Sequence, residues 1–320
     1  MKKIGVMTSG GDSPGMNACV RAVVRTAISK GLSVKGIQRG FAGLLDGDIH
    51  EMGRRDVSGI IQQGGTILQT ARCLEFKEPK GQRLGLRRLN EESIDGLVVV
   101  GGDGSLRGGL ALHEAGFPVV GVPGSIDNDI EGTDMSIGVD TTLNTILRAL
   151  DALRDTASSH ERAFLVEVMG RNCGYLAAVG GILGGAEMIC IPERPFELEE
   201  VAHVVQDAYV QGKNHALIVV AEGASHGINA IAEFLRQHEV GFDVRVTILG
   251  HVQRGGRPSA FDRLLATRLG VAAVSELLAG NSGVMVGLRG RKIGTVSLED
   301  ATSSQRAVNP EYVELFNFVS

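Results

Sequence analysis

The chain has 320 residues, a mass of 33.7 kDa and a formal net charge of −5. This length suffices for two α/β lobes, each with its own core, and the charge argues against nucleic acid as the main partner. The sequence has no long apolar segment and no signal-peptide pattern, so we expect a cytoplasmic protein without membrane association. The cysteines lack metal-ligand spacing, which favours reduced thiols at Cys19, Cys73, Cys173 and Cys190.

The first predicted strand, residues 3–8, leads into a glycine turn and then into a helix that ends near residue 30. The turn reads Ser9-Gly10-Gly11-Asp12 and continues to Asn17. Exposed amides and the helix dipole favour a phosphate at such a helix N-terminus. The spacing matches neither a P-loop nor a dinucleotide motif, so structural glycines in a tight turn explain it about as well.

A second predicted strand, residues 96–100, runs into Gly101-Gly102-Asp103-Gly104-Ser105 and a helix through residue 112. Glycines around one carboxylate allow the backbone to approach a polyphosphate while the carboxylate reaches its magnesium ion. This pattern is more specific than the first turn.

The apolar run 117–122 predicts a buried strand, and the loop after it contains Asp127 and Asp129. In a doubly wound α/β sheet, ligands bind outside the carboxyl ends of the strands, so these carboxylates are placed to meet substrate. An ordinary Asp/Asn turn is the alternative for this loop taken alone.

Further strands are predicted at 163–169, 216–220 and 244–249, and Asp140 is a predicted N-cap of the helix that precedes them. Each strand leads into a polar loop. Repeated strand-loop-helix units indicate an α/β protein with doubly wound parallel sheets.

Five loops together resemble the motifs of bacterial ATP-dependent 6-phosphofructokinase, in order from Lys3 to about Arg268. They are Ser9-Gly10-Gly11-Asp12 with Pro14-Gly15-Met16-Asn17, Gly101-Gly102-Asp103-Gly104-Ser105, Pro123-Gly124-Ser125-Ile126-Asp127-Asn128-Asp129, Met169-Gly170-Arg171 and Gly250-His251-Val252-Gln253-Arg254-Gly255-Gly256. The resemblance implies a nucleotide-binding lobe (1–138 and about 253–303), a sugar-phosphate lobe (139–252 and about 304–320), and a homotetramer whose active sites are shared between subunits.

The resemblance implies a role for each residue that matches its motifs. Asp127 would accept the proton of the sugar's 1-hydroxyl, and Arg171 would add positive charge. Asp103 would hold magnesium (Mg2+), with Asp129 reaching the ion through water. The implied ATP-binding residues are Gly11, Arg72, Cys73, Gly102, Asp103, Gly104 and Ser105, of which Gly11 and Arg72 would contact the transferring group.

Fructose 6-phosphate is the implied acceptor. Arg162 and Arg245 would come from a neighbouring subunit to bind its phosphate, with His251 and Arg254. Met169 and Glu222 would hold the sugar. The full implied set is Ser125, Asp127, Asp129, Arg162, Met169, Gly170, Arg171, Glu222, Arg245, His251 and Arg254.

Small residues at two positions, Gly104 and Gly124, go with ATP in the family, whereas an acidic residue and a lysine there go with pyrophosphate. Ser125 stands where the family usually has threonine and keeps the hydroxyl. Three alternatives remain: a pyrophosphate-dependent enzyme, a kinase of the Gly-Gly-Asp-Gly type with another acceptor, and a non-catalytic nucleotide-sensing subunit.

The resemblance also implies an effector site. The family binds ADP or GDP as activator, or phosphoenolpyruvate as inhibitor, between subunits. Gln211 replaces a residue that is usually basic, and Gly59 stands where an acidic residue can occur, so we expect a weakened site. The matching positions are Arg21, Arg25, Arg54, Arg154, Gly185, Glu187, Gln211 and Lys213.

Overall fold

The computed structural model describes residues 1–157 and 161–319, which form two compact units. The first unit contains Met1–Thr141 and Arg254–Gln305. The second contains Thr142–Gln253 and the chain from Arg306 onward. Two elements cross the division, α5 (Val139–Ala157) and the short 3-10 helix η2 (Gly250–Arg254).

The sheet of the first unit has the order β11-β10-β5-β4-β1-β2-β3. Its five central strands are parallel, and the edge strands β3 and β11 run antiparallel to their neighbours. The register aligns Ser9 with Gly101 and Gly101 with Pro123, so β1, β4 and β5 end at one level. The strands are β1 (Lys3–Ser9), β2 (Ser33–Ile37), β3 (Ile49–Glu51), β4 (Gly96–Gly101), β5 (Val119–Pro123), β10 (Val284–Arg289) and β11 (Lys292–Ser297).

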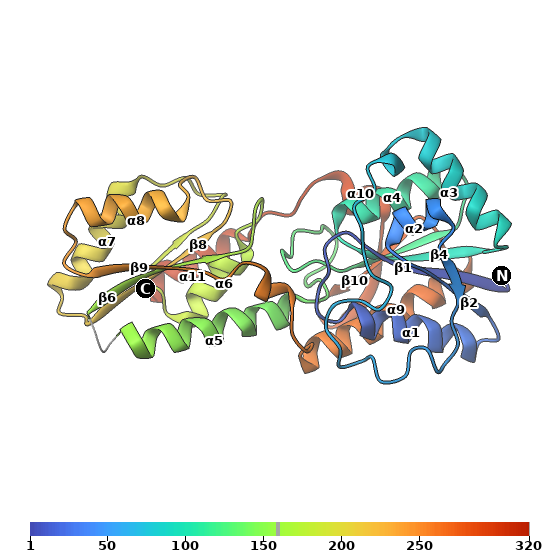
Figure 1. Ribbon diagram of the computed structural model, residues 1–320, viewed down its shortest axis with the longest axis horizontal. Coiled ribbons are helices and arrows are strands. Elements are labelled where there is room, and N and C mark those ends of the chain that lie inside the picture. The colour runs from blue at the N-terminus through green and yellow to red at the C-terminus, as the bar shows by residue number, and fades with distance from the viewer. Residues whose placement is uncertain (158–160, 320) are drawn as a thin grey trace. The chain divides into compact units, whose positions relative to one another are not determined.

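Both faces of this sheet are buried, because successive residues of a strand point to opposite faces. Val98 and Val100 of β4 join the cluster that contains α1 and α9, whereas Leu97 and Val99 join the cluster under α2, α3, α4 and α10. Figure 1 shows these two helical layers on either side of the sheet. The helices are α1 (Met16–Ser29), α2 (Gly40–Asp46), η1 (Glu75–Lys77), α3 (Pro79–Glu91), α4 (Asp103–Glu114), α9 (Ala260–Ala279) and α10 (Leu298–Ser303).

The second unit has a parallel sheet of order β7-β8-β6-β9. Helices α7 and α8 pack on one face, and α6, with α11 against it, packs on the other. The elements are β6 (Arg162–Val168), α6 (Tyr175–Gly184), β7 (Met188–Cys190), α7 (Leu198–Val210), β8 (His215–Ala221), α8 (Ile228–Gln237), β9 (Asp243–Ile248) and α11 (Pro310–Val319).

The predicted fold class, α/β with doubly wound parallel sheets, is confirmed, although the edge strands β3 and β11 are antiparallel. The prediction of Asp140 as an N-cap is wrong, because α5 begins one residue earlier, at Val139. Asp140 lies in the first turn, where its carboxylate accepts a hydrogen bond of 2.5 Å from Ser259 Oγ. Within the described residues, no helix has both the length and the apolar character needed to cross a membrane.

Candidate active site

A pocket of about 790 Å³ lies in the first unit where β1, β4 and β5 end. Strand β1 is followed in the sheet by β2 toward one edge, and β4 is followed by β5 toward the other edge. The connecting helices α1 and α4 cover opposite faces of the sheet. This is a topological switch point, where α/β sheets bind ligands. The pocket gathers eleven of the predicted site residues: Gly11, Arg72, Cys73, Gly102, Asp103, Gly104, Ser105, Ser125, Asp127, Asp129 and Arg254.

The glycine turn after β1 lies close to the Arg254 guanidinium. A Cβ at Gly11 would lie 2.5 Å from Arg254 Nη1, and Arg254 donates from this atom to the Asp12 carbonyl at 3.1 Å. Glycine at position 11 therefore allows the guanidinium to lie against the backbone. Residues 250–254 of η2 bring Arg254 into the pocket with the three aspartates.

The turn after β5 is held by side-chain hydrogen bonds. The Asp127 amide donates to Ser125 Oγ at 3.3 Å, and Ser125 Oγ donates to Asp129 Oδ1 at 3.3 Å. Between the two aspartates, buried Asn128 has a φ of 52°, and its amide group bridges to the Asp134 carbonyl and the Ser136 amide. Asparagine tolerates the left-handed region better than most residues, so it suits this turn.

Burial raises the pKa of Asp129 above its usual value, and the nearby negative charge of Asp103 adds to the effect. The hydrogen bond from Ser125 opposes the rise but does not cancel it. A cation placed between the two carboxylates would relieve both the burial cost and the repulsion.

Asp103 is the first residue of α4, and its side chain is 21% exposed in the pocket. Its Oδ2 accepts a hydrogen bond from Arg107 Nε, while its Oδ1 has no hydrogen-bond partner in the part of the chain that the structure describes. Within this described part, the enclosed Oδ1 is therefore unpaired, and the oxygen that reaches the pocket, Oδ2, is paired with Arg107. No group of three or more His, Cys, Asp or Glu side chains among the described residues could hold a metal. Asp103 and Asp129 both line the pocket, and their carboxylate oxygens are the ligand type that magnesium and other hard cations prefer.

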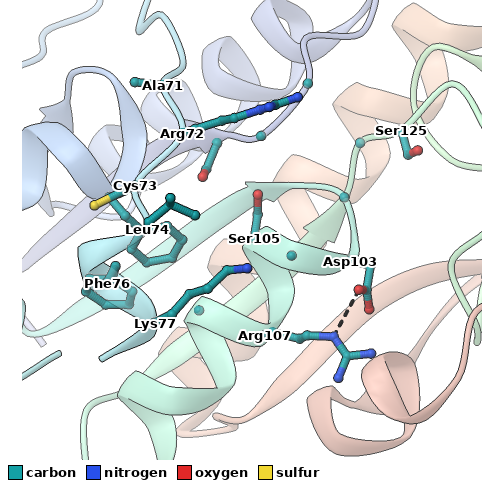
Figure 2. Close-up of a pocket in the computed structure, with 18 of the residues that line it drawn as sticks. Ala71, Arg72, Cys73, Leu74, Phe76, Lys77, Asp103, Ser105, Arg107 and Ser125 are labelled. Atoms are coloured by element: carbon teal, nitrogen blue, oxygen red, sulfur yellow. Dashed lines mark hydrogen bonds and ion pairs between the residues drawn. The ribbon is translucent and has the colours of Figure 1, made fainter. Parts of the chain in front are cut away.

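The pocket also contains residues that the sequence analysis missed. Phe41 and Phe76 stack with ring centroids 4.2 Å apart and form an apolar wall. Lys77 is directed into the pocket from η1, and Arg107 lies one turn after Asp103 on α4 (Figure 2). The spacing of Asp103 and Arg107 was a signal present in the sequence, because residues four apart share a helix face.

In the second unit, the loops after β6 and β8 lie beside each other. The Glu222 amide donates to the Val168 carbonyl at 2.9 Å, and the Arg171 guanidinium lies 4.0 Å from the Glu222 carboxylate. The Met169 amide donates to Gln253 Oε1 at 3.1 Å. Gly170 has a φ of 129° and leaves room for the Cys173 carbonyl, while His251 is exposed in η2. These predicted sugar-binding residues therefore share the carboxyl end of this sheet.

Arg162 and Arg245 lie toward the opposite end of that sheet. Arg162 begins β6, and Arg245 on β9 is paired with Phe164. Both guanidinium groups approach the Asp243 carboxylate, at 3.7 Å from Arg162 and 2.6 Å from Arg245. At about 3.3 Å per residue, the length of β6 separates this pair from Met169 by roughly 20 Å. Within one chain, the two arginines cannot share a small ligand with Met169.

The predicted effector residues fall in both units. In the second unit, Arg154 donates to the carbonyls of Gly184 and Gly185, and Lys213 lies 3.4 Å from Glu187. Gln211 follows the last residue of α7. In the first unit, Arg21 and Arg25 lie on α1, Arg54 follows β3, and Gly59 has a φ of 68°.

The sequence profile of the family described as Phosphofructokinase matches residues 3–277. The chain is 51% identical over 321 residues to an ATP-dependent 6-phosphofructokinase of Thermotoga neapolitana, covering 100% of both chains. It is 52% identical to that of Natranaerobius thermophilus, covering 98% of this chain and 97% of the relative. A solved phosphofructokinase structure from Saccharomyces cerevisiae is 39% identical with a TM-score of 0.88; the match covers 99% of this chain and 50% of the yeast chain.

Proposed function

The chain belongs to the phosphofructokinase family, and we propose that it binds ATP and transfers a phosphoryl group in the pocket of its first unit. Its function is that of an ATP-dependent 6-phosphofructokinase of glycolysis: it phosphorylates the 1-hydroxyl of fructose 6-phosphate, giving fructose 1,6-bisphosphate and ADP. The observation that carries this proposal is the gathering of Asp103, Asp127 and Asp129 with the glycine turns in one pocket, in a chain similar over its whole length to enzymes with this activity.

Asp127 is the proposed general base. Phosphoryl transfer depends mainly on positioning and charge neutralisation, with a carboxylate to accept the hydroxyl proton. As the 1-hydroxyl oxygen of the sugar bonds to the γ-phosphorus, its proton passes to Asp127 and the bond from phosphorus to the bridging oxygen of ADP breaks. The hydrogen bond from the Asp127 amide to Ser125 supports this role, because it restrains the backbone that carries the carboxylate.

A divalent metal ion is expected for a kinase of this family, and we propose magnesium. Asp103 would hold it together with the nucleotide phosphates, and Asp129 would reach it through water. The bound ion supplies neutralisation of phosphate charge. The two carboxylates lie in the same pocket, and the raised pKa of Asp129, to which the charge of Asp103 contributes, supports this assignment.

Positive charge and backbone donors complete the proposed nucleotide site. The Gly11 amide and Arg72 would contact the transferring group, and Arg171 would add charge stabilisation. Arg72 is directed into the pocket, and none of the described residues forms a hydrogen bond or ion pair with its side chain (Figure 2). Such an unpaired guanidinium suits an anionic ligand.

The sugar phosphate is assigned to the second unit and to a neighbouring subunit. Met169, Glu222 and His251 would hold it from one subunit, with Arg254. Arg162 and Arg245 would come from another subunit, which requires an oligomer, and we propose the homotetramer. The position of these two arginines, far from Met169 along β6, supports a shared site.

ATP is the proposed donor rather than pyrophosphate. A Cβ at Gly104 would meet nothing within 4 Å, so the pocket is open beside this residue. A larger acidic residue there would project into that space. The ATP-dependent relatives favour the same donor.

A coupled assay with fructose 6-phosphate tests the function. We expect turnover with ATP and magnesium, and only background with pyrophosphate or without a donor. Turnover with pyrophosphate alone would favour the pyrophosphate-dependent alternative. Turnover with another acceptor but not fructose 6-phosphate would favour the alternative kinase, and no turnover with any donor would favour the nucleotide-sensing subunit.

We also propose a weakened effector site for ADP, GDP or phosphoenolpyruvate. Two contacts between proposed effector residues support this site: Arg154 donates to the Gly185 carbonyl, and Lys213 donates to the Glu187 carboxylate. Gln211 supplies hydrogen bonds without charge, which should lower effector affinity by about 1 to 2 kcal/mol. Gln211→Lys should therefore lower the ADP or phosphoenolpyruvate concentration needed to change the rate at subsaturating sugar phosphate. An unchanged rate in both proteins at millimolar effector would contradict the proposal.

A further inference from the structure

Arg107 forms an ion pair with the carboxylate assigned to the metal. Its Nε donates to Asp103 Oδ2 at 2.9 Å, and both residues lie on the first two turns of α4 (Figure 2). The Arg107 side chain is 52% exposed and lines the pocket. The arginine therefore belongs to the nucleotide pocket, although the phosphoryl transfer described above does not use it.

The two oxygens of Asp103 differ in accessibility. Oδ1 is enclosed and has no hydrogen-bond partner among the described residues, yet the side chain as a whole is 21% exposed. The oxygen through which Asp103 meets the pocket is thus Oδ2, which is the oxygen that Arg107 occupies. A metal ion that approaches this carboxylate meets a guanidinium already bound to it.

We propose that Arg107 competes with the divalent cation for Asp103 and thereby sets how strongly nucleotide binding depends on metal. This inference rests on the proposed role of Asp103. In the nucleotide-free protein, the guanidinium neutralises Asp103. When the metal–nucleotide complex binds, the cation replaces Arg107 at Oδ2, and the half-exposed guanidinium turns toward the nucleotide phosphates.

Charge determines the sign of the effect. Arg107 attracts the phosphates of a metal-free nucleotide and repels a divalent cation at the same carboxylate. It therefore narrows the difference in affinity between the metal-free and the metal-bound nucleotide. Removing the charge should widen that difference by about threefold to tenfold, a modest effect because the arginine is half exposed and screened.

Calorimetric titration of the full-length protein with ADP and with Mn2+·ADP provides the test. The metal dependence is measured as the dissociation constant of ADP divided by that of Mn2+·ADP. We expect Arg107→Gln and Arg107→Met to raise this ratio threefold to tenfold, whereas Arg107→Lys stays near wild type. Gln keeps a hydrogen-bond donor without the charge, so it separates the charge from a positioning hydrogen bond. The matched control is Arg87→Met, which removes the exposed Arg87–Glu91 pair of α3 outside the pocket and should not alter the ratio.

An unchanged or lower ratio in Arg107→Gln and Arg107→Met would overturn the proposal, as would an Arg107→Lys protein that behaves like Arg107→Met. Asp103→Asn distinguishes failure of this inference from failure of the proposed function. If Asp103→Asn abolishes the metal dependence and the Arg107 variants do not change it, only the role of Arg107 is wrong. If Asp103→Asn retains the metal dependence, the metal assignment itself is wrong.

Discussion

Asp127 and its neighbours show how a short loop can present carboxylates at a defined place. The turn lies directly after β5, and Ser125 links the Asp127 amide to the Asp129 carboxylate. The three residues lie in the pocket that also contains Asp103. The loop therefore places the carboxylates of Asp127 and Asp129 in the same pocket as that of Asp103.

Asp127→Ser should lower kcat by about 10² to 10⁴, because general-base assistance is worth roughly this factor. Binding of ATP and fructose 6-phosphate should remain close to wild type, since the substitution removes no proposed anchor for either phosphate. Steady-state kinetics and calorimetric binding together check this. Near-normal turnover in the variant would remove Asp127 from the role of base.

Asn128→Ala should lower both the stability and kcat, although Asn128 is not proposed to touch substrate. The substitution removes the hydrogen bonds that Asn128 makes with the Asp134 carbonyl and the Ser136 amide, and it places alanine at a φ of 52°. We expect a loss of about 1 to 3 kcal/mol in unfolding free energy. Denaturant unfolding measures it, and Asn128→Asp, which keeps an acceptor oxygen, should retain more activity. A fully stable Asn128→Ala protein would contradict this account of the turn.

Among the elements, the start of α9 contacts the start of α5 through Asp262. This buried carboxylate accepts hydrogen bonds from the Gly138 amide and from the amide and hydroxyl of Thr141, while the Asp262 amide donates to Ser259, the N-cap of α9. Burial raises its pKa above the usual value, and the hydrogen bonds oppose the rise. Two segments distant in sequence are therefore joined by one desolvated acid.

The raised pKa of Asp262 predicts a pH dependence of stability. Between the unfolded and folded pKa values the folded protein binds more protons, so the contribution of Asp262 to stability falls as pH rises through the folded pKa. Compared with Asp262→Asn, which does not titrate, the wild-type protein should gain relative stability as pH is lowered from 7 toward 4. Denaturant unfolding of both proteins across this range checks the sign. If the stability of the wild-type protein relative to Asp262→Asn is constant, or rises with pH, then burial does not dominate the pKa of Asp262.

For the whole molecule, the main question is whether active sites are completed by a second subunit. Arg245→Ser should raise the Michaelis constant for fructose 6-phosphate about tenfold to a hundredfold, because it removes a charge-assisted contact to a phosphate that does not react. Its kcat should change little. Arg87→Ser, which removes an exposed side chain of α3, is the control and should leave both constants unchanged.

Mixing the subunits tests the sharing directly. Arg245→Ser and Asp127→Ser chains, each impaired alone, should regain activity when unfolded and refolded together, because some hybrid sites then combine an intact Asp127 with an intact Arg245. Mixtures no more active than the separate proteins would indicate that each site belongs to one chain.

Much of the fold was predictable because the strands are short apolar runs followed by glycine or polar loops. The run before Gly101 is a buried central strand, as its valines suggested. Strands β3 and β7, of three residues each, were missed because so short a run has no clear period. The hairpin of β10 and β11 was missed as well; β11 is the edge strand and mixes polar with apolar residues, whereas β10 is an inner strand whose apolar run was not recognised.

The sequence alone determined the family and the reaction, because Gly-Gly-Asp-Gly-Ser and Pro-Gly-Ser-Ile-Asp-Asn-Asp are local patterns whose residue types directly express the chemistry. Only the tertiary structure decided which side chains meet. It brought Arg254 against Gly11, stacked Phe41 on Phe76, and left Arg107 on the one accessible oxygen of Asp103. These contacts depend on strand order, helix placement and side-chain burial, which arise from packing across segments far apart in the chain.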